Sequence, residues 1–462
     1  MNQLKKFMTV LLVLILFLTV YNRPAFAEED RNDEYIRLFL EAEEEIREVE
    51  EEIAKGSLGF FLWHDPDSPA AAIIEERLEN QTNDSWGDIE LGVKGDATSL
   101  DNMYTAILFI QEGNAIRAND GYGETYPLMI SDELMAVSQI QTTNSARIMA
   151  HSRMYGVTEN LAWGYSDPFS VWYNEEKAGW LSGVRGWDVA HFENLINPGG
   201  MYSARISTGF GMTTRGTIYG ATHGQVFGTA ANFPDAKLYT AEEYLEDFNT
   251  YRDGLNERME KAKKQREEAL SHIAPVITSL ANSEKGTEIL FKKITGIEEY
   301  VILRDSGRGF EETARVKTED LSDHGLYFRY CDEETSAAFG HSFRYAVKAV
   351  VEGEESSYEE KKITRVRSIT VSSISWMSNS SVSVNADLGS LNGFEVRYSE
   401  DGENWLSQES VYPYALITGL DKTKTYQFRV RGYLETEEGR FWSAFTEYKG
   451  KIGDLTVTPD SK

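Results

Sequence analysis

The spacing of apolar residues changes once along this chain, near residue 280, and this change rules out one uniform fold. Before it, apolar residues recur three and four positions apart, as at Leu100, Met103 and Ile107, which is the pattern of an amphipathic helix. After it, segments such as YVILRD (300–305) and YQFRVRGY (426–433) alternate apolar and polar residues, as half-buried strands do. The sequence therefore predicts a multidomain chain with helical and mixed α+β parts first and all-β modules last.

The first 27 residues have the features of a secretory signal. Lys5 and Lys6 precede an apolar run from Met8 to Val20, and Ala25-Phe26-Ala27 supplies the small residues that a signal peptidase needs. We expect cleavage after Ala27 and a secreted, extracellular protein. No later stretch is apolar for long enough to predict a membrane span.

The net charge argues against nucleic-acid partners, and the cysteine content argues against internal disulfides. The chain has 46 basic and 75 acidic residues, which gives a formal net charge of -29. Such a surface repels phosphates and anionic lipid headgroups, so we expect no nucleic-acid partner. Cys331 is the single cysteine, so no internal disulfide can form, which fits a bacterial exported protein built on ordinary cores.

Composition and turn signals divide the chain after the signal. Residues 28–96 predict an acidic helix followed, from Gly56 to about Ala97, by a loop-rich preamble. Residues 97–236 predict an α+β domain. Residues 240–274 predict a long helical spacer, which Thr240 and Glu243 open as a capping box.

Within residues 97–236, two helix starts are marked by caps. Ser131 can cap a helix whose apolar stripe His151 continues, so we expect His151 on that helix, pointing inward, and a helix end at Gly156. Asp167-Pro168 opens a further helix, with Asp as the cap and Pro at the first helical position. The segments ISTGFGM (206–212) and GQVFGTAANF (224–233) predict strands.

The last part of the chain predicts two tandem β-sandwiches, at 283–366 and 367–454. Two stretches repeat weakly, each with a Tyr before an alternating strand and a polar turn after it. In the second, Tyr426, Arg429, Val430 and Arg431 resemble the penultimate strand of a fibronectin type III module, and Trp442-Ser443 stands where its last strand begins. Such modules are expected to act as spacers or as adhesive surfaces.

Four residues in the predicted α+β domain could carry chemistry together: His151, Glu159, Glu175 and His191. Two imidazoles and two carboxylates can bind a divalent metal, most plausibly zinc. They can also perform general acid–base catalysis, or form a buried hydrogen-bonded cluster that only stabilises the domain. Spacing leaves all three alternatives open, because the four residues lie on different predicted elements.

Six short motifs follow one another between Ser131 and about Phe233. They are SDELM (131–135), HSR (151–153), ENLA (159–162), WYNE (172–175), HFEN (191–194) and TGFG (208–211). In this order they resemble the CAP superfamily of cysteine-rich secretory proteins, antigen 5 and plant pathogenesis-related proteins, whose module is also called the SCP domain. ENLAWGYSDP and WYNEEKA resemble its secreted bacterial branch in particular.

The resemblance implies an α-β-α sandwich with a large central cleft. It implies that His151 and His191 can bind a divalent metal in this cleft and that Glu159 and Glu175 complete the tetrad as candidate catalytic carboxylates. Alignment to the Trp-x-x-Glu pattern selects Glu175 over Glu176. The sequence departs from the family at Thr158, where Gly is usual, and at Ala190-His191-Phe192, where Gly-His-Tyr is usual.

Three functions are consistent with these residues. The first is a binding protein whose cleft holds a small apolar or peptide ligand between Trp163, Tyr165, Trp172 and Phe192; some relatives in the family bind sterols and lipids. The second is a metal-dependent extracellular hydrolase with a Glu as general base. The third is an adhesive protein whose β-modules bind an extracellular protein or polysaccharide surface. We favour binding over catalysis, since catalytic zinc usually takes three protein ligands and two histidines alone would be a thin site. No motif supplies a Ser or Cys nucleophile, so a covalent mechanism is not expected.

Overall fold

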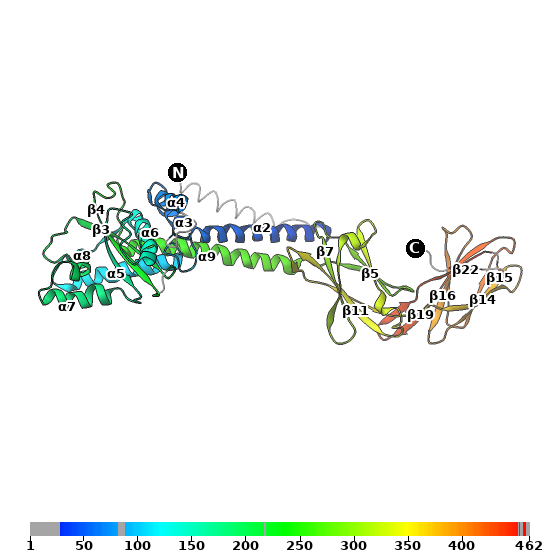
Figure 1. The fold of residues 1–462 in the computed structure, drawn as a ribbon. Helices are drawn as coiled ribbons and strands as arrows, with labels where there is room; N and C mark the ends of the chain where they lie inside the picture. Colours follow the sequence, from blue (N-terminus) through cyan, green and yellow to red (C-terminus); the bar gives the residue numbers. More distant parts are fainter. Residues whose placement is uncertain (1–27, 82–87, 217–218, 451, 453–455, 459–462) are drawn as a thin grey trace. The chain divides into compact units, whose positions relative to one another are not determined.

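The computed structural model describes residues 28–81, 88–216, 219–450, 452 and 456–458, so the predicted signal peptide lies outside the described residues. The chain is multidomain and divides into two compact units (Figure 1). One is Glu41–Lys264, and the other combines Met1–Leu40 with Gln265–Lys462. Two long helices, α2 (Glu28–Ala54) and α9 (Ala241–His272), cross the boundary between the units. Within the described residues, we find no helix with the length and apolar character that a bilayer span requires.

A four-stranded sheet forms the centre of the α/β unit, residues 41–264, in the order β1-β3-β4-β2. β1 runs parallel to β3, and the other neighbours are antiparallel. This order leaves β2 at one edge of the sheet. The strands are β1 (Met129–Ile130), β2 (Thr158–Trp163), β3 (Arg205–Thr213) and β4 (Thr222–Thr229).

Helices cover both faces of this sheet. α6 (Asp132–Ile148) lies against the glycine face of β3, where a Cβ on Gly209 would come within 2.1 Å of the Leu134 backbone. The next residue, Phe210, points to the other face, since successive strand residues alternate. There it stacks on Phe109 of α5 (Leu100–Asp120), with ring centroids 5.3 Å apart. The unit is thus layered helix, sheet, helix.

Short helical segments follow β2 on the α5 side of the sheet. They are the π-helix η1 (Ser170–Glu175), α7 (Glu176–Leu181), the 3-10 helix η2 (Gly186–Val189) and α8 (Ala190–Ile196). Asp167 Oδ1 accepts the Phe169 backbone N–H at 2.8 Å just before the first of them. A helical segment therefore starts close to the predicted position, but its first turn is π rather than α and its N-cap residue is Phe169 instead of Asp167.

The other two predicted helix caps are confirmed. Ser131 Oγ accepts the backbone N–H of Leu134 at 3.2 Å. At the start of α9, Thr240 and Glu243 form the reciprocal capping box: the Thr240 N–H donates to Glu243 Oε2 at 2.9 Å, and the Glu243 N–H donates to Thr240 Oγ1 at 3.1 Å. These signals succeed because a cap depends on residues only three positions apart.

Two local predictions were wrong. The loop-rich preamble contains two helices, α3 (Gly56–His64) and α4 (Ala70–Asn80), because the apolar run GFFLW buries Phe60 and Phe61 completely and ties the segment to the core. α6 ends at Ile148, where Met149 takes the left-handed conformation with φ 49. His151 therefore lies beyond the helix, and its side chain is 42% exposed instead of pointing inward.

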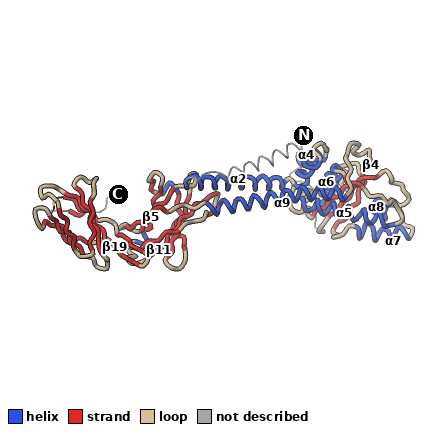
Figure 2. Tube along the Cα trace, turned by 180° about the vertical axis from the view of Figure 1, so that it is seen from behind, coloured by secondary structure: helices blue, strands red, loops and turns tan. Residues whose placement is uncertain are grey.

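The other unit contains several β-sandwich sheets (Figure 2). In its first sandwich, a four-stranded sheet β5-β6-β10-β9 faces a five-stranded sheet β12-β11-β7-β8, in which β13 pairs with β11. Tyr300 and Tyr345 are fully buried in this core. The strands are β5 (Ile277–Asn282), β6 (Thr287–Lys292), β7 (Glu299–Asp305), β8 (Phe310–Lys317), β9 (Ser322–Asp323), β10 (Tyr327–Asp332), β11 (Ser342–Val351), β12 (Glu354–Glu355) and β13 (Glu360–Thr364).

The second sandwich pairs a three-stranded sheet, β14-β15-β18, with a six-stranded sheet, β17-β16-β19-β21-β22, in which β20 pairs with β19. Phe394, Val396 and Phe428 are fully buried between them. The strands are β14 (Thr370–Trp376), β15 (Ser381–Asp387), β16 (Gly393–Ser399), β17 (Leu406–Ser410), β18 (Tyr414–Thr418), β19 (Tyr426–Thr436), β20 (Gly439–Trp442), β21 (Thr446–Gly450) and β22 (Thr456–Thr458).

Candidate functional site

The first histidine of the predicted tetrad pairs with a buried carboxylate. His151 Nδ1 lies 2.8 Å from Glu159 Oε2 on β2. The other oxygen of Glu159 accepts the side-chain amide of Gln141 at 3.0 Å, and Gln141 in turn accepts the Tyr155 N–H. An ionised carboxylate can only accept, so Nδ1 of His151 carries a proton and its Nε2 is left for another partner.

The second histidine has the same arrangement on different elements. His191 Nδ1, on α8, lies 2.5 Å from Glu176 Oε1, and the Phe192 N–H donates to Glu176 Oε2 at 2.9 Å. The indole of Trp172 stacks on the His191 ring with centroids 6.2 Å apart. The His191 side chain remains 29% exposed. Its Nε2 is therefore the nitrogen that a ligand would meet.

The carboxylate that meets His191 is Glu176, not the predicted Glu175. Glu175 is exposed at the end of η1, whereas Glu176 follows Trp172 by four residues. Residues three and four apart both lie near one helix face, so periodicity does not distinguish Glu175 from Glu176. The Trp-x-x-Glu pattern selected Glu175, whereas Glu176, the first residue of α7, is the one that reaches His191.

The two histidine–carboxylate pairs approach β2 from its two faces. Glu159 lies on the α6 face, where Trp163 Nε1 also donates to the Ser145 carbonyl. The next residue, Asn160, points the other way and donates to the His191 carbonyl at 3.0 Å. Among the residues that the structure describes, no three or more His, Cys, Asp or Glu side chains gather as a metal site would require. Three of the four predicted residues therefore lie in two separate pairs, His151–Glu159 and His191–Glu176, and the predicted Glu175 belongs to neither.

The predicted aromatic wall divides into core and surface. Trp172 and Phe192 are 0% exposed, so they support the fold and do not face a ligand. Tyr165 is 43% exposed, and Trp163 is partly exposed with its indole N–H bonded to Ser145. Of the four predicted cleft residues, only Trp163 and Tyr165 reach the surface.

A divalent metal fits these donors only in part. A histidine that gives its Nδ1–H to a carboxylate has the orientation seen around protein-bound metals, with Nε2 as the ligand atom. His151 and His191 both meet this condition. Catalytic zinc, however, usually takes three protein ligands, and Glu159 and Glu176 are already held by the imidazoles and by other donors. The residues fit an ion held by imidazole nitrogens and water better than a catalytic zinc centre.

A third histidine site was missed by the sequence analysis. His64 Nδ1 lies 3.1 and 3.0 Å from the two oxygens of Asp132, and its Nε2 lies 3.3 Å from Asp247 on α9. Tyr244 OH also donates to Asp132, at 2.6 Å. Burial opposes the charge on His64, but its hydrogen bonds and charge interactions with Asp132 and Asp247 outweigh burial and raise its pKa. No sequence signal joins residues 68 and 183 positions apart.

Comparisons with known proteins add little to this geometry. No family model matches the chain, and no curated protein matches it. Among solved structures, the crystal structure of chicken CNTN1 FN1-FN3 domains is similar at 15% sequence identity and a TM-score of 0.22. The match covers 40% of this chain and 66% of that chain. The likeness concerns fibronectin type III domains and carries no argument about function.

Proposed function

We propose that this is a secreted, CAP-like binding protein in which His151 and His191, in their two separate pairs, each offer an imidazole nitrogen to a divalent metal ion, with zinc the first candidate. One observation carries the proposal: both imidazoles give Nδ1 to a carboxylate and keep Nε2 at a partly exposed ring. This pairing fixes the tautomer and the ring orientation that metal binding needs. The order of motifs from Ser131 to Phe233 supports the CAP-like assignment.

The ligand that we propose beside the metal is a small apolar or peptide molecule. Tyr165 and Trp163 follow Glu159 on the same segment and offer aromatic surface with polar edges. Such rings combine apolar contact with a few hydrogen bonds, which is the usual chemistry of small-molecule sites.

Zinc titration of the full-length chain by calorimetry tests the metal. We expect saturable binding that the double change His151→Ala, His191→Ala abolishes. Glu176→Gln should weaken zinc binding by about tenfold or more, as removal of a partner that orients a ligand does. Glu175→Gln is the matched control, because it changes the neighbouring exposed carboxylate, and it should leave affinity unchanged. Equal effects of the two Glu changes, or zinc binding by the double His variant, would refute the proposal.

A metal-dependent hydrolase is the alternative, and the positions of the carboxylates count against it. A general base must come within hydrogen-bond reach of the water that it activates. Both oxygens of Glu159 are held, by His151 and Gln141, and both oxygens of Glu176 are held, by His191 and the Phe192 N–H.

An adhesive role of the second sandwich has one observation in its favour. Tyr412 and Tyr414 are 63% and 52% exposed, and their rings stack with centroids 6.0 Å apart. Exposed apolar surface of this kind marks interaction sites. Attachment of the full chain to an extracellular polysaccharide should fall in the variant Tyr412→Ser, Tyr414→Ser, and unchanged attachment would exclude this surface.

A further inference from the structure

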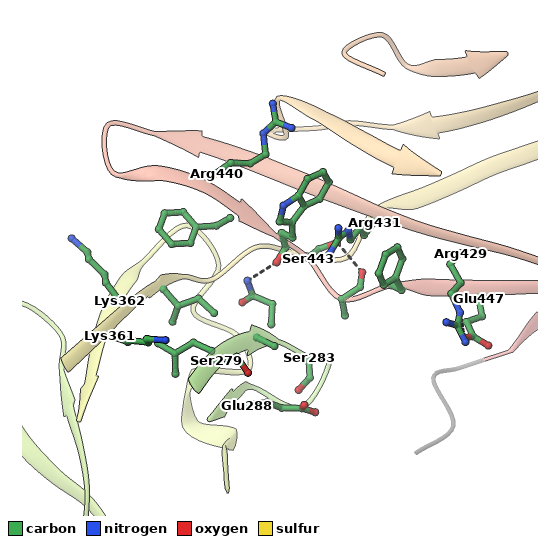
Figure 3. Close-up of a pocket in the computed structure, with 18 residues that line it drawn as sticks. Ser279, Ser283, Glu288, Lys361, Lys362, Arg429, Arg431, Arg440, Ser443 and Glu447 are labelled. Atoms are coloured by element: carbon green, nitrogen blue, oxygen red, sulfur yellow. Dashed lines mark hydrogen bonds and ion pairs between the residues drawn. The ribbon is translucent and has the colours of Figure 1, made fainter. Parts of the chain in front are cut away.

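A cavity of about 660 Å³ lies in the β-rich unit, and its lining is basic and aromatic (Figure 3). Residues of β5, β6 and β13 line one side, and residues of β19, β20 and β21 line the other. This volume lies in the range of small-molecule pockets, about 300–1,000 Å³.

The charged residues that line the cavity are mostly basic, whereas the chain as a whole is acidic. Its cations outnumber its carboxylates by five to two, in a protein whose formal net charge is -29. A concave site lined mostly by one sign of charge concentrates its field on ligands of the opposite sign. The cations are Lys361, Lys362, Arg429, Arg431 and Arg440, and the carboxylates are Glu288 and Glu447.

Aromatic rings hold two of the arginines in place. The guanidinium of Arg431 lies over Trp442 and Phe445, 4.1 and 4.5 Å from the ring centroids. That of Arg429 lies over Trp405, at 4.3 Å. A stacked guanidinium has lost much of its freedom before a ligand arrives, so an oxyanion meets a prepared, planar set of donors.

The ion pairs of these arginines leave part of each group available. Arg429 Nε donates to Glu447 at 2.5 Å, and Arg431 Nε donates to Glu395 at 2.6 Å. Among the described residues these bonds use Nε, so the two terminal nitrogens of each arginine remain for a ligand. Two terminal nitrogens can form paired, end-on hydrogen bonds with a carboxylate or phosphate.

Lys361 adds a charge that forms no ion pair with any carboxylate in the described part of the chain. Its Nζ donates to the backbone carbonyl of Thr278 at 2.8 Å, and it takes part in no ion pair among the described residues. Lys362, by contrast, pairs with Glu438. An ammonium bonded only to a neutral carbonyl still attracts an anion.

We propose that this cavity binds a small oxyanion-bearing ligand, whose carboxylate or phosphate groups Lys361 attracts from one side and Arg429 and Arg431 from the other. The lining rings of Phe441, Trp442 and Phe445 accommodate the less polar part of the ligand. This site is independent of the histidine pairs in the other unit.

Calorimetric titration of the full-length chain at low salt tests the site with three probes: tri-galacturonate, inorganic phosphate and neutral maltotriose. We expect one of the two anions to bind saturably, with affinity that falls as salt rises, and maltotriose to show no binding. Tighter binding of tri-galacturonate would indicate that the natural ligand carries carboxylates, and tighter binding of phosphate would indicate that it carries phosphate. If neither anion binds saturably, or maltotriose binds equally well, the proposal fails.

Two variants locate the binding. The double change Lys361→Gln, Arg429→Gln should weaken the anion by about tenfold or more, since it removes two charged donors. Lys424→Gln is the control, because Lys424 is an exposed, ion-paired cation of the same sandwich, 51% exposed and bonded to Glu400. Should the double variant not fold, the surface change Lys361→Gln alone should still weaken binding several-fold. Equal weakening by Lys424→Gln would show only a general charge effect and would overturn the proposal.

Discussion

Two carboxylates face the two ring nitrogens of His64, and this arrangement makes one residue a sensor of pH. Asp132 lies on α6 and Asp247 on α9, while Tyr244 and Tyr239 pack against the imidazole. Both nitrogens can donate only in the imidazolium form. Burial, and after it the same nearby carboxylates, raises the pKa of Tyr239 to about 12 and also raises the pKa of Tyr244. Neither tyrosine therefore ionises near neutrality.

His64→Gln should therefore remove a pH-dependent part of stability. Because the folded-state pKa of His64 is raised above 6.5, its contribution is fully present below pH 6.5 and is lost as pH rises through the folded-state pKa. At pH 6 we expect His64→Gln to lower the free energy of unfolding of the α/β unit by about 3 kcal/mol. Urea unfolding from pH 5.5 to 8.5 should show this difference shrinking as pH rises.

The control for this prediction is His324→Gln, which changes an exposed histidine in the other unit. It should leave the urea transition of the α/β unit unchanged at every pH. A wild-type curve and a His64→Gln curve that stay parallel across the range would contradict the role given to His64.

Single residues also show what sequence could reveal about the site. His151, Glu159 and His191 are found from short motifs, and each forms the histidine–carboxylate contact that a tetrad requires. Glu176 was missed because Glu175 and Glu176 both share a helix face with Trp172, and the Trp-x-x-Glu pattern of the resemblance selected Glu175. His64 was missed because its partners are distant in sequence and meet only after folding.

At the scale of elements, prediction succeeded where three or four neighbouring residues decide the structure. The caps of α6 and α9 are of this kind. The helices α3 and α4 were not predicted, because the glycines of α3 and the Asp and Pro residues at 65–69 between the helices favour loops locally. In α3, burial of Phe60 and Phe61 against the core overrides that tendency. β2 was missed for a related reason: its pattern ENLA was interpreted as a motif, not as a strand.

The close packing of α6 against β3 leads to a prediction about the stability of the α/β unit. Gly209→Ala should destabilise the α/β unit by about 3 kcal/mol or more, because the new methyl group would lie 2.1 Å from the Leu134 backbone and must push helix and strand apart. Gly156→Ala is the matched control, since a Cβ there meets nothing within 4 Å. Urea unfolding compares the two, and equal midpoints would show that the sheet tolerates a wider gap from α6.

At the scale of the whole molecule, the order of the parts could be predicted from the change in apolar spacing, but the contacts at their boundaries could not. Arg365 shows why. It lies between β13 and β14, is 0% exposed, and has no sequence signal that marks it as different from exposed Arg367. Its burial depends on carbonyl groups from two separate segments, 282–286 and 335–336, which come together only in the folded sandwich.

Those carbonyls satisfy the guanidinium of Arg365 completely. Its Nε donates to the Thr335 carbonyl at 3.0 Å, and its terminal nitrogens donate to four further oxygens. These are Asn282 Oδ1 at 2.8 Å and the carbonyls of Gly286, Ser283 and Ser336 at 2.7, 3.1 and 3.3 Å. Five donors thus meet five acceptors, which is the full capacity of an arginine. A lysine has three donors on one atom and cannot span the same set.

Arg365→Lys should therefore cost about 3 kcal/mol of stability in the first sandwich, because several buried carbonyls lose their donors and a charge stays buried. Arg367→Lys makes the same chemical change two residues away, at an exposed position, and should alter the free energy of unfolding by less than about 0.5 kcal/mol. Urea unfolding of both full-length variants measures the difference. If Arg365→Lys unfolds at the same midpoint as Arg367→Lys, the buried network contributes nothing that an ammonium and trapped water cannot supply.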